Sequence, residues 1–458
     1  MKFSRSDVRT KVHAFPELKF ENEALTSFAG LVIFQKFFAA INLKARLSGC
    51  FRHFAGGKVF DRATIFLQLI LHLLLGYREL QECRHYREDP LFKRVLGLKR
   101  TPDVATLSRM LKESTAKSVE NLRGLLRRMV LERLVSLALA RVTLDFDGSV
   151  QSTRRHAEGT AVGFNKKKKG ARSYYPLFGT VAQTGQVFDF LHRPGNVHDS
   201  NGARAFILQC VDEVRAAVSG SVIEGRLDSA FFSDEIVTAL DQRRTEFTVS
   251  VPFERFGELK RMIERRRRWR RLNKNVSYFE ASWKPQKWNK QFRFLFIRTR
   301  VKKQQKGPIQ LDLFVPHERG YEFKVIVTNK TVRAKAVVAF HEGRGSQEAI
   351  FAELKSHGHQ DYVPVRTLCG NQTYLLAGLF AYNLTRELQM QTMKPIRRTT
   401  AKRACLWAFE RLDNIRKTLI QRAGRLTRPH GTLTLTISAN TWLRRRILHL
   451  LSAIHAHA

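Results

Sequence analysis

The chain has 458 residues, 43% of them hydrophobic, which is enough for two to four compact units with buried cores. Lysine and arginine outnumber aspartate and glutamate by 81 to 40, so the formal net charge is +41, and the excess is spread along the chain. Such a charge favours a polyanionic partner, and nucleic acid rather than a membrane surface.

The longest apolar stretch, Ala63–Gly76, is interrupted by Gln68 and His72. A bilayer-spanning helix needs about 20 apolar residues, so this shorter stretch predicts a buried helix. The first residues are charged and lack a following apolar stretch of the signal-peptide type, so we expect a cytoplasmic, nucleoid-associated protein. The five cysteines are far apart and predict neither a zinc site nor a disulfide framework.

Residues 1–139 form the first predicted region, and helical spacing of apolar residues dominates it from Ser27 to Leu139. Thr101-Pro102-Asp103 supplies a turn and a cap before a basic helix that carries Arg109 and Lys112. Such helices either read a DNA end in helix-turn-helix fashion or serve as scaffold, and the residues favour neither.

Residues 140–252 change to a strand-like period. RVTLDFDG alternates, SYYPLFGTVAQTGQVFDFLHR predicts a hairpin that closes at Thr184-Gly185, and NGARAFILQCVDEVRAAV predicts a helix. Next come a strand in SVIEGRLDS, a helix in SDEIVTAL and a strand in EFTVSVPF. This order predicts an α/β fold, with a mixed sheet flanked by helices.

The rest of the chain divides into three further regions. Residues 253–335 are rich in arginine and aromatic residues and predict a β-rich insertion. Helical spacing resumes near Ser346, so residues 336–392 predict a return to the core, and residues 393–458 predict a basic, mostly helical C-terminal region.

Three acidic residues stand beside glycine or small residues in this basic chain. Asp147 ends VTLDFDGS, Asp228 ends IEGRLDSA, and Glu348 lies in HEGRGSQEAIFAELK. Two divalent ions about 3.5 to 4 Å apart can activate an attacking oxygen and stabilise a leaving oxygen at a phosphodiester. Magnesium, or manganese, prefers such carboxylate oxygens, so the three residues are candidate metal ligands.

The segment around Glu348 has a helical geometry that suits phosphate chemistry. At about 100° per residue, Lys355 falls within about 20° of Glu348, Arg344 within about 40°, and His341 lies on the same side. Glu353 falls about 140° away. One acid and two cations on one face can bind metal and phosphate, whereas alone this pattern would indicate an ordinary solvated helix.

At these residues the sequence resembles the DDE transposases of bacterial insertion sequences that carry a Tyr-x2-Arg-x3-Glu-x6-Lys signature. His341, Arg344, Glu348 and Lys355 keep that spacing, with histidine in place of tyrosine. The resemblance covers roughly residues 141–387. It implies an RNase H-like core interrupted by a β-rich insertion, with Asp147, Asp228 and Glu348 as catalytic metal ligands, and a homodimer working on double-stranded transposon ends and target DNA.

Several further residues are weaker candidates. Asp145 shares a strand face with Asp147 and is the fallback metal ligand. Two basic runs are candidate DNA contacts, although solvated loops explain such runs more often: Lys166, Lys167, Lys168 and Lys169, and Arg265, Arg266, Arg267 and Arg268. Two tryptophans are candidates for stacking on a flipped base, with burial in the insertion as the alternative: Trp283 and Trp288. Three loop residues have no assigned role: His192, Arg193 and His198.

The function expected from these residues is binding of terminal inverted repeats, metal-dependent strand cleavage and strand transfer. Metal-activated water would cut at the end of the element, and the freed 3′-hydroxyl would attack the opposite strand or the target. Two alternatives remain open: an RNase H-like nuclease that needs no paired ends, and an inactive, transposase-derived DNA-binding regulator.

Overall fold

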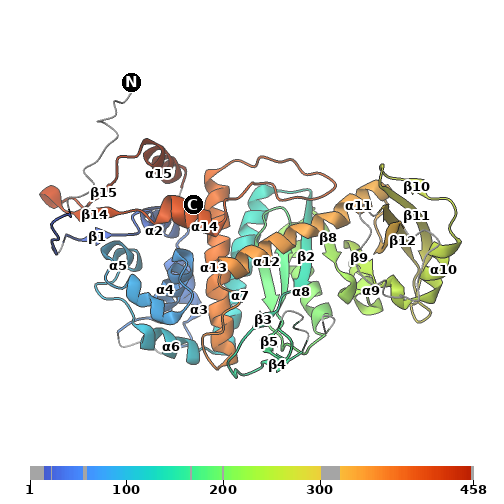
Figure 1. Cartoon of the computed structure of the whole chain (residues 1–458), viewed down its shortest axis with the longest axis horizontal. Helices are drawn as coiled ribbons and strands as arrows, with labels where there is room; N and C mark the ends of the chain where they lie inside the picture. Colours follow the sequence, from blue (N-terminus) through green and yellow to red (C-terminus); the bar gives the residue numbers. More distant parts are fainter. Residues whose placement is uncertain are drawn as a thin grey trace.

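A computed structural model describes residues 15–21, 23–54, 59–163, 165, 168–198, 201–300 and 320–454. The predicted contacts Lys166 and Lys167 lie outside these residues. Along the long axis of the molecule, the N-terminal helices are followed by a central sheet with its helices and then by the insertion (Figure 1). Among the described residues, every helix is too short or too polar to span a bilayer.

The N-terminal region is helical, as predicted. Its elements are α2 (Leu31–Ala40), α3 (Leu43–Cys50), α4 (Arg62–Leu75), the 3-10 helix η1 (Leu80–His85), α5 (Pro90–Leu96), α6 (Val104–Lys112) and α7 (Ala116–Leu137). Side chains cap several of these helices, and Asp103 accepts a hydrogen bond from the Thr106 amide at the start of α6. All of α4 beyond Arg62 is buried, which confirms the buried helix predicted there.

The helix α13 (Leu368–Thr392) joins the N-terminal helices to the rest of the chain. It packs against α4, α6 and α7, and nearly all of its side chains are buried. In Figure 1 it stands, with α7 beside it, between the other N-terminal helices and the central sheet. One hydrophobic cluster runs through both, with Phe66 of α4 edge-on to Phe380 of α13.

In the described part of the chain, nine strands form one mixed sheet in the order β10-β11-β12-β13-β9-β8-β2-β6-β7. The core strands are β2 (Arg141–Gly148), β6 (Leu177–Val181), β7 (Val187–Leu191), β8 (Val222–Leu227) and β9 (Glu246–Val251). Strands β2, β8 and β9 run parallel, whereas β6 and β7 form the predicted hairpin. Its turn holds Gly185 at φ +62°, a conformation that glycine adopts without strain. The helices α8 (Ala203–Ala217) and α9 (Asp234–Gln242) complete the predicted α/β order.

The insertion continues the central sheet. It contains η3 (Phe253–Arg255), α10 (Gly257–Arg265), β10 (Arg270–Arg271), β11 (Val276–Trp283), β12 (Phe292–Arg300) and β13 (Tyr321–Thr328). Strand β13 pairs antiparallel with β9, with Val325 opposite Val251. The insertion is therefore fixed to the core by main-chain hydrogen bonds, rather than by a linker.

The helical path that follows begins earlier than predicted. It comprises α11 (Ala334–Glu342), the 3-10 turn η4 (Gly343–Gly345) and α12 (Ser346–Ser356), and the backbone keeps right-handed helical angles through the junctions. This path crosses the sheet diagonally in Figure 1. Helical structure thus starts at Ala334 rather than near Ser346, because the two glycines of η4 tighten the path without ending it.

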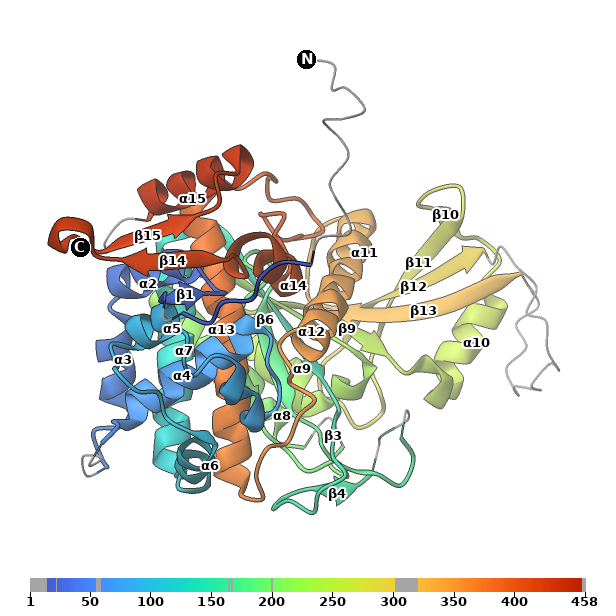
Figure 2. The same cartoon turned by 60° about the vertical axis from the view of Figure 1, so that its left-hand side comes forward.

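The C-terminal region contains a strand hairpin as well as helices. Its elements are α14 (Leu412–Ile415), the π-helix η5 (Arg416–Ile420), β14 (Gly424–Thr427), η6 (Pro429–Gly431), β15 (Thr434–Ile437) and α15 (Thr441–Ala453). Strand β1 (Leu25–Thr26) joins the hairpin, which lies over the N-terminal helices (Figure 2). The alternating residues Thr432 to Ile437 have the period of a strand, a signal that the helical interpretation missed.

Candidate functional site

Asp147 and Asp228 lie at the same edge of the central sheet. The parallel strands β2 and β8 pair Asp145 with Arg226. Asp147 and Asp228 each follow that pair by two residues, so both lie at the same end of these neighbouring strands. Asp228 caps the short helix η2 (Ser229–Phe231) by accepting a hydrogen bond from the Ala230 amide at 2.9 Å. Both aspartates are partly exposed, so their carboxylates can meet a substrate at this edge.

Asp145, the fallback ligand, is bound in the interior. Its side chain is 1% exposed, and its two carboxylate oxygens accept hydrogen bonds from Arg226 at 2.5 and 2.6 Å. Burial raises the pKa of Asp145, and the Arg226 charge opposes this rise. Arg226 also donates to the carbonyl oxygens of Phe340 and Lys402. A carboxylate that neutralises a buried guanidinium suits a structural role, so the geometry favours Asp147 as the ligand.

The helical path α11–η4–α12 brings Arg344 to Asp147. The Nη1 atom of Arg344 lies 3.2 Å from a carboxylate oxygen of Asp147, and both side chains are about one-fifth exposed. Gln347 donates a hydrogen bond to the carbonyl oxygen of Asp145 at 3.1 Å, which fixes the first turn of α12 to β2. Glu348 follows Arg344 by about one helical turn, so it points to the same side, and it is exposed.

Gly343 sets how closely this helical path approaches the sheet. A β-carbon built at Gly343 would lie 1.9 Å from Nη1 of Arg226 and 2.1 Å from the carbonyl oxygen of Lys402. Only glycine fits there. Neither Gly343 nor Arg226 was predicted as a site residue from the sequence, although Arg226 shares a strand face with Asp228, two residues later.

The three proposed metal ligands do not form a closed site in this structure. Within the described residues, no three His, Cys, Asp or Glu side chains are close enough to hold an ion together. Magnesium usually keeps several waters and takes one or two carboxylates together with substrate phosphates. The two aspartates at the strand ends, with Glu348 on the adjacent helix, therefore suit a divalent ion that takes its remaining ligands from substrate and water.

His341 does not lie where a phosphate contact requires it. Its side chain is 1% exposed, Nε2 is 2.8 Å from the Ser250 hydroxyl, and Nδ1 is 3.0 Å from the Thr248 hydroxyl. Burial, together with the charges of Lys324 and Arg344, holds its pKa well below the usual value. The predicted phosphate contact is corrected to a neutral histidine that fastens α11 to β9.

The predicted basic contacts remain on the surface. Lys355 is exposed on α12, on the Glu348 side of the helix, and Glu353 on the opposite side is buried in an ion pair with Arg386, as expected from helical geometry. Lys168 and Lys169 are exposed between β4 (Ala161–Val162) and β5 (Arg172–Tyr174). The residues of the second basic run are also exposed, at the end of α10 and just after it: Arg265, Arg266, Arg267 and Arg268.

The two tryptophans lie in the core of the insertion. Trp283 and Trp288 are each 7% exposed. Trp283 donates to Glu258 at 2.7 Å and packs edge-on against Phe294, and Trp288 packs against Phe232. In this structure both tryptophans are therefore buried, as the alternative interpretation had it, and are not placed to stack on a flipped base.

The loop that follows β7 holds the three unassigned residues. The ring of His192 packs on the ring of Tyr174, with 4.2 Å between the ring centroids. Arg193 is buried and donates a hydrogen bond to the Tyr175 carbonyl oxygen. His198 is exposed. The first two residues thus hold this loop against a second, small sheet with the strand order β3-β5-β4, in which β3 spans Gln151–Ser152.

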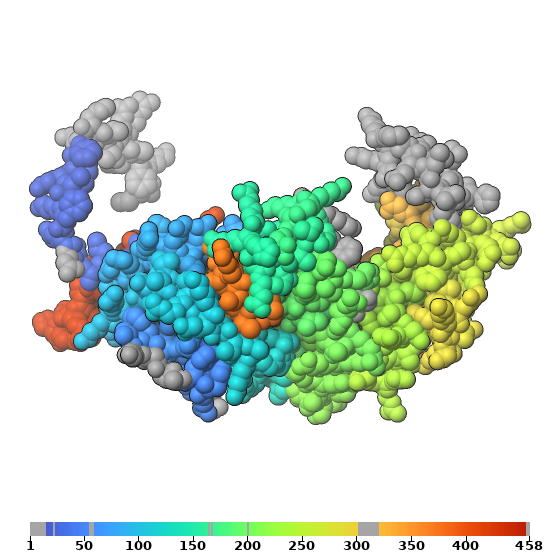
Figure 3. Space-filling model, turned by 90° about the horizontal axis from the view of Figure 1, so that it is seen from below, coloured from blue at the N-terminus to red at the C-terminus, as the bar shows by residue number. Residues whose placement is uncertain are grey.

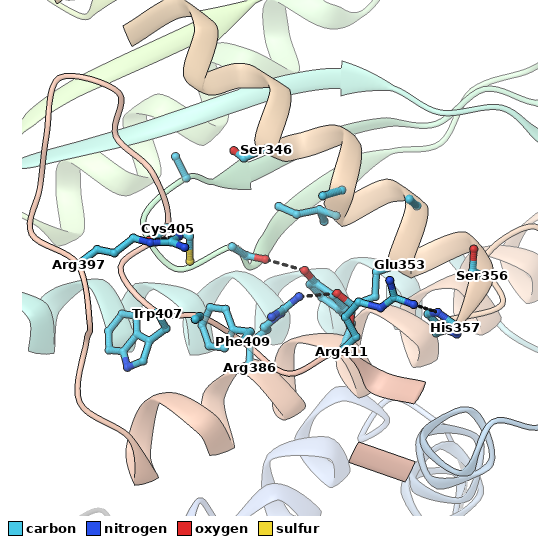
Figure 4. Close-up of a pocket in the computed structure, with 17 residues that line it drawn as sticks. Ser346, Glu353, Ser356, His357, Arg386, Arg397, Cys405, Trp407, Phe409 and Arg411 are labelled. Carbon is cyan, nitrogen blue, oxygen red and sulfur yellow. Dashed lines mark hydrogen bonds and ion pairs between the residues drawn. The ribbon is translucent and has the colours of Figure 1, made fainter. Parts of the chain in front are cut away.

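A cavity of about 510 Å³ lies beside α12, apart from the candidate site. Figure 4 shows Glu353, Arg386, Trp407 and Phe409 around it, between α12, α13 and the segment that follows α13. None of the three candidate carboxylates lines it. The candidate site is instead the open edge of the sheet at Asp147 and Asp228.

Residues 10–458 match the protein family described as "Transposase DDE domain group 1". The chain belongs to this transposase family. Its function is therefore DNA transposition, and the sheet of mixed direction flanked by helices agrees with the fold that the sequence predicted.

Two further comparisons add little to the family assignment. No curated protein matches the chain significantly. Among solved structures, the chain is similar to the piggyBac transposase, whose cryo-EM structure is a synaptic complex with hairpin DNA, with a TM-score of 0.39 and 12% identity. The match covers 93% of this chain and 85% of that chain.

Proposed function

We propose that this transposase cuts and joins DNA at the ends of an insertion sequence, with Asp147, Asp228 and Glu348 as its metal ligands. The contact between Arg344 and Asp147 carries the proposal, because it joins the helix that bears Glu348 to the strand edge that bears both aspartates. Family membership supports DNA as the substrate.

Each residue has a distinct part in this proposal. Asp147 and Asp228 supply carboxylate oxygens from adjacent strand ends, and Glu348 supplies a third from α12. Divalent ions, expected to be two magnesium or manganese ions, would activate the attacking oxygen and stabilise the leaving oxygen. Arg344 can bind phosphate oxygens through two N–H groups, and Lys355 adds a mobile positive charge on the same side of α12.

The proposed substrate determines the oligomeric state that we expect on DNA. Terminal inverted repeats must be held in pairs for strand transfer, so we infer that two copies of the chain work together as a homodimer on double-stranded DNA. The free 3′-hydroxyl made by the first cut is the nucleophile for the second reaction, so no covalent link to the protein is required.

The decisive experiment maps cut positions at nucleotide resolution. Purified protein and its Glu348→Gln variant are incubated with magnesium and with the DNA that flanks the gene. Cuts at the boundary of the element that disappear in the variant support the proposal. Binding without cuts in both proteins favours the inactive regulator, and cuts that persist in the variant refute the role of Glu348.

A further inference from the structure

A basic groove of about 490 Å³ lies beside the small sheet that follows β2. This small sheet has the strand order β3-β5-β4, and β3 (Gln151–Ser152) begins four residues after Asp147. The lining residues are Arg78, Glu79, Ser152, Thr153, Arg154, Arg155, Lys168, Ala171, Asp361, Tyr362 and Val363.

Three parts of the chain that are distant in sequence build the groove. Arg78 precedes η1 in the N-terminal region, Thr153 and Lys168 belong to the core, and Tyr362 lies between α12 and α13. Figure 3 shows this face of the molecule, where orange surface from the part of the chain near α12 and α13 lies between the blue N-terminal region and the green-cyan small-sheet region. The groove therefore lies at a junction of all three parts.

Hydrogen bonds fix the walls of the groove to one another. Arg155 donates to the Pro364 carbonyl oxygen at 2.7 Å, and Gln151 donates to the Tyr362 carbonyl oxygen at 3.1 Å. Arg78 pairs with Asp361 at 3.1 Å. Walls joined in this way form a site before any ligand arrives, which lowers the entropic cost of binding.

The charge of the groove favours an anionic ligand. Four cations line it, Arg78, Arg154, Arg155 and Lys168, against the two carboxylates of Glu79 and Asp361. Asp361 is already paired with Arg78. The side chains of Arg154 and Lys168 are exposed and make no hydrogen bond or ion pair with any described residue, so their charges are available to a ligand.

The groove lies within reach of the candidate reaction site. Ser152 follows Asp147 by five positions, and a fully extended chain over that interval spans at most about 17 Å. One strand of DNA carries a phosphate about every 3.4 Å along the helix axis. A strand that presents its scissile phosphate to Asp147 therefore has its next few phosphates at the distance of the groove.

We propose that this groove binds the phosphodiester backbone of the substrate DNA within about five phosphates of the cut bond. This inference rests on the proposed function only in placing the cut near Asp147. The contacts are to phosphates, so they hold the strand in place and carry no sequence preference.

The first test uses the Arg154→Ala/Lys168→Ala double variant and a duplex of arbitrary sequence. Each phosphate contact contributes about 0.9 to the slope of log Kd against log salt, so we expect this slope to fall by about 2. The matched control is Arg444→Ala/Arg445→Ala, which removes the same charge from exposed positions on α15. An equal fall in both variants means a general charge effect and overturns the proposal.

The second test locates the contact on the DNA. Single phosphates near the mapped cut are replaced by uncharged methylphosphonates, and binding is measured without metal. Replacements at successive positions within about five phosphates of the cut should each weaken binding by the wild type and have no further effect on binding by the double variant. If the loss of affinity from a replacement is the same in the double variant as in the wild type, the groove does not contact that phosphate. Because binding is the readout, this result does not depend on whether Glu348→Gln abolishes cutting.

Discussion

Asp145 and Asp147 share one face of β2, yet the structure gives them different surroundings. Asp145 neutralises the buried Arg226, whereas Asp147 is partly exposed and meets Arg344. Sequence periodicity alone left both residues open as ligands. What separates them is the arginine on the neighbouring strand, and strand pairing is not visible in the sequence.

Changing each aspartate to alanine should therefore affect a different property: stability for Asp145 and cleavage for Asp147. Asp145→Ala leaves Arg226 buried without its partner, so we expect the free energy of unfolding to fall by about 3–5 kcal/mol. Asp147→Ala removes a partly exposed ion pair worth at most about 1 kcal/mol, and it should abolish cleavage while DNA binding persists. Urea unfolding and boundary cleavage are measured on both variants. Normal cleavage by folded Asp147→Ala would remove this residue from the site.

Arg344 should also control how well the free protein binds a divalent cation. Its guanidinium lies 3.2 Å from the Asp147 carboxylate, so it competes with a metal ion for the same oxygens. We expect Arg344→Gln to bind Mn²⁺ up to about fivefold more tightly in the absence of DNA, since a partly exposed ion pair is worth up to about 1 kcal/mol. Calorimetric titration measures this, and an unchanged affinity would mean that the ion pair does not compete with metal.

At the scale of elements, the position of α12 depends on one glycine. Gly343 leaves no room for a β-carbon beside Arg226, whereas a β-carbon at Gly345 would have no atom within 4 Å. We expect Gly343→Ala to cost about 1–3 kcal/mol of stability and to reduce cleavage, because the helix must move away from the sheet. Gly345→Ala is the matched control and should stabilise the helix by up to about 1 kcal/mol. Equal unfolding free energies of the two variants would contradict this view of the contact.

The sequence predicted most elements, whereas it predicted few of their partners. Period-two and helical patterns correctly predicted the strands of the large sheet and the helices between Arg141 and Val251, since those patterns are local, but they missed the short strands β3, β4 and β5. The pairing of β13 with β9 joins residues more than seventy positions apart, and no local pattern encodes it. His341 shows the same limit at the site, because its spacing fits a phosphate contact while its hydroxyl partners come from β9.

At the scale of the whole molecule, a buried cluster around Glu224 ties three regions together. Glu224 on β8 is fully buried and pairs with Arg141 on β2, with Lys330 just after β13, and with Arg403 in the segment that follows α13. The insertion and the C-terminal region thus share one carboxylate with the core. Removing that carboxylate leaves Arg403 without its acidic partner and leaves Arg141 and Lys330 to share Glu246 alone. A buried charge that loses its partner costs several kcal/mol.

This cluster should make the stability of the whole chain depend on pH in the acid range. Burial opposes the ionisation of Glu224, but the hydrogen bond from Arg403 and the charge of Lys330 lower its pKa from 4.5 to about 2. A depressed pKa stabilises the fold above about pH 4.5, and this contribution is lost as the pH falls toward 2. Glu224→Gln should therefore be less stable than the wild type by about 3–5 kcal/mol at pH 7, with the gap narrowing steadily below pH 4.5.

Urea unfolding at a series of pH values measures the gap, with Glu322→Gln, at an exposed position on β13, as the control. A gap that stays constant down to the lowest accessible pH would show that Glu224 is not the residue that couples these regions to protonation.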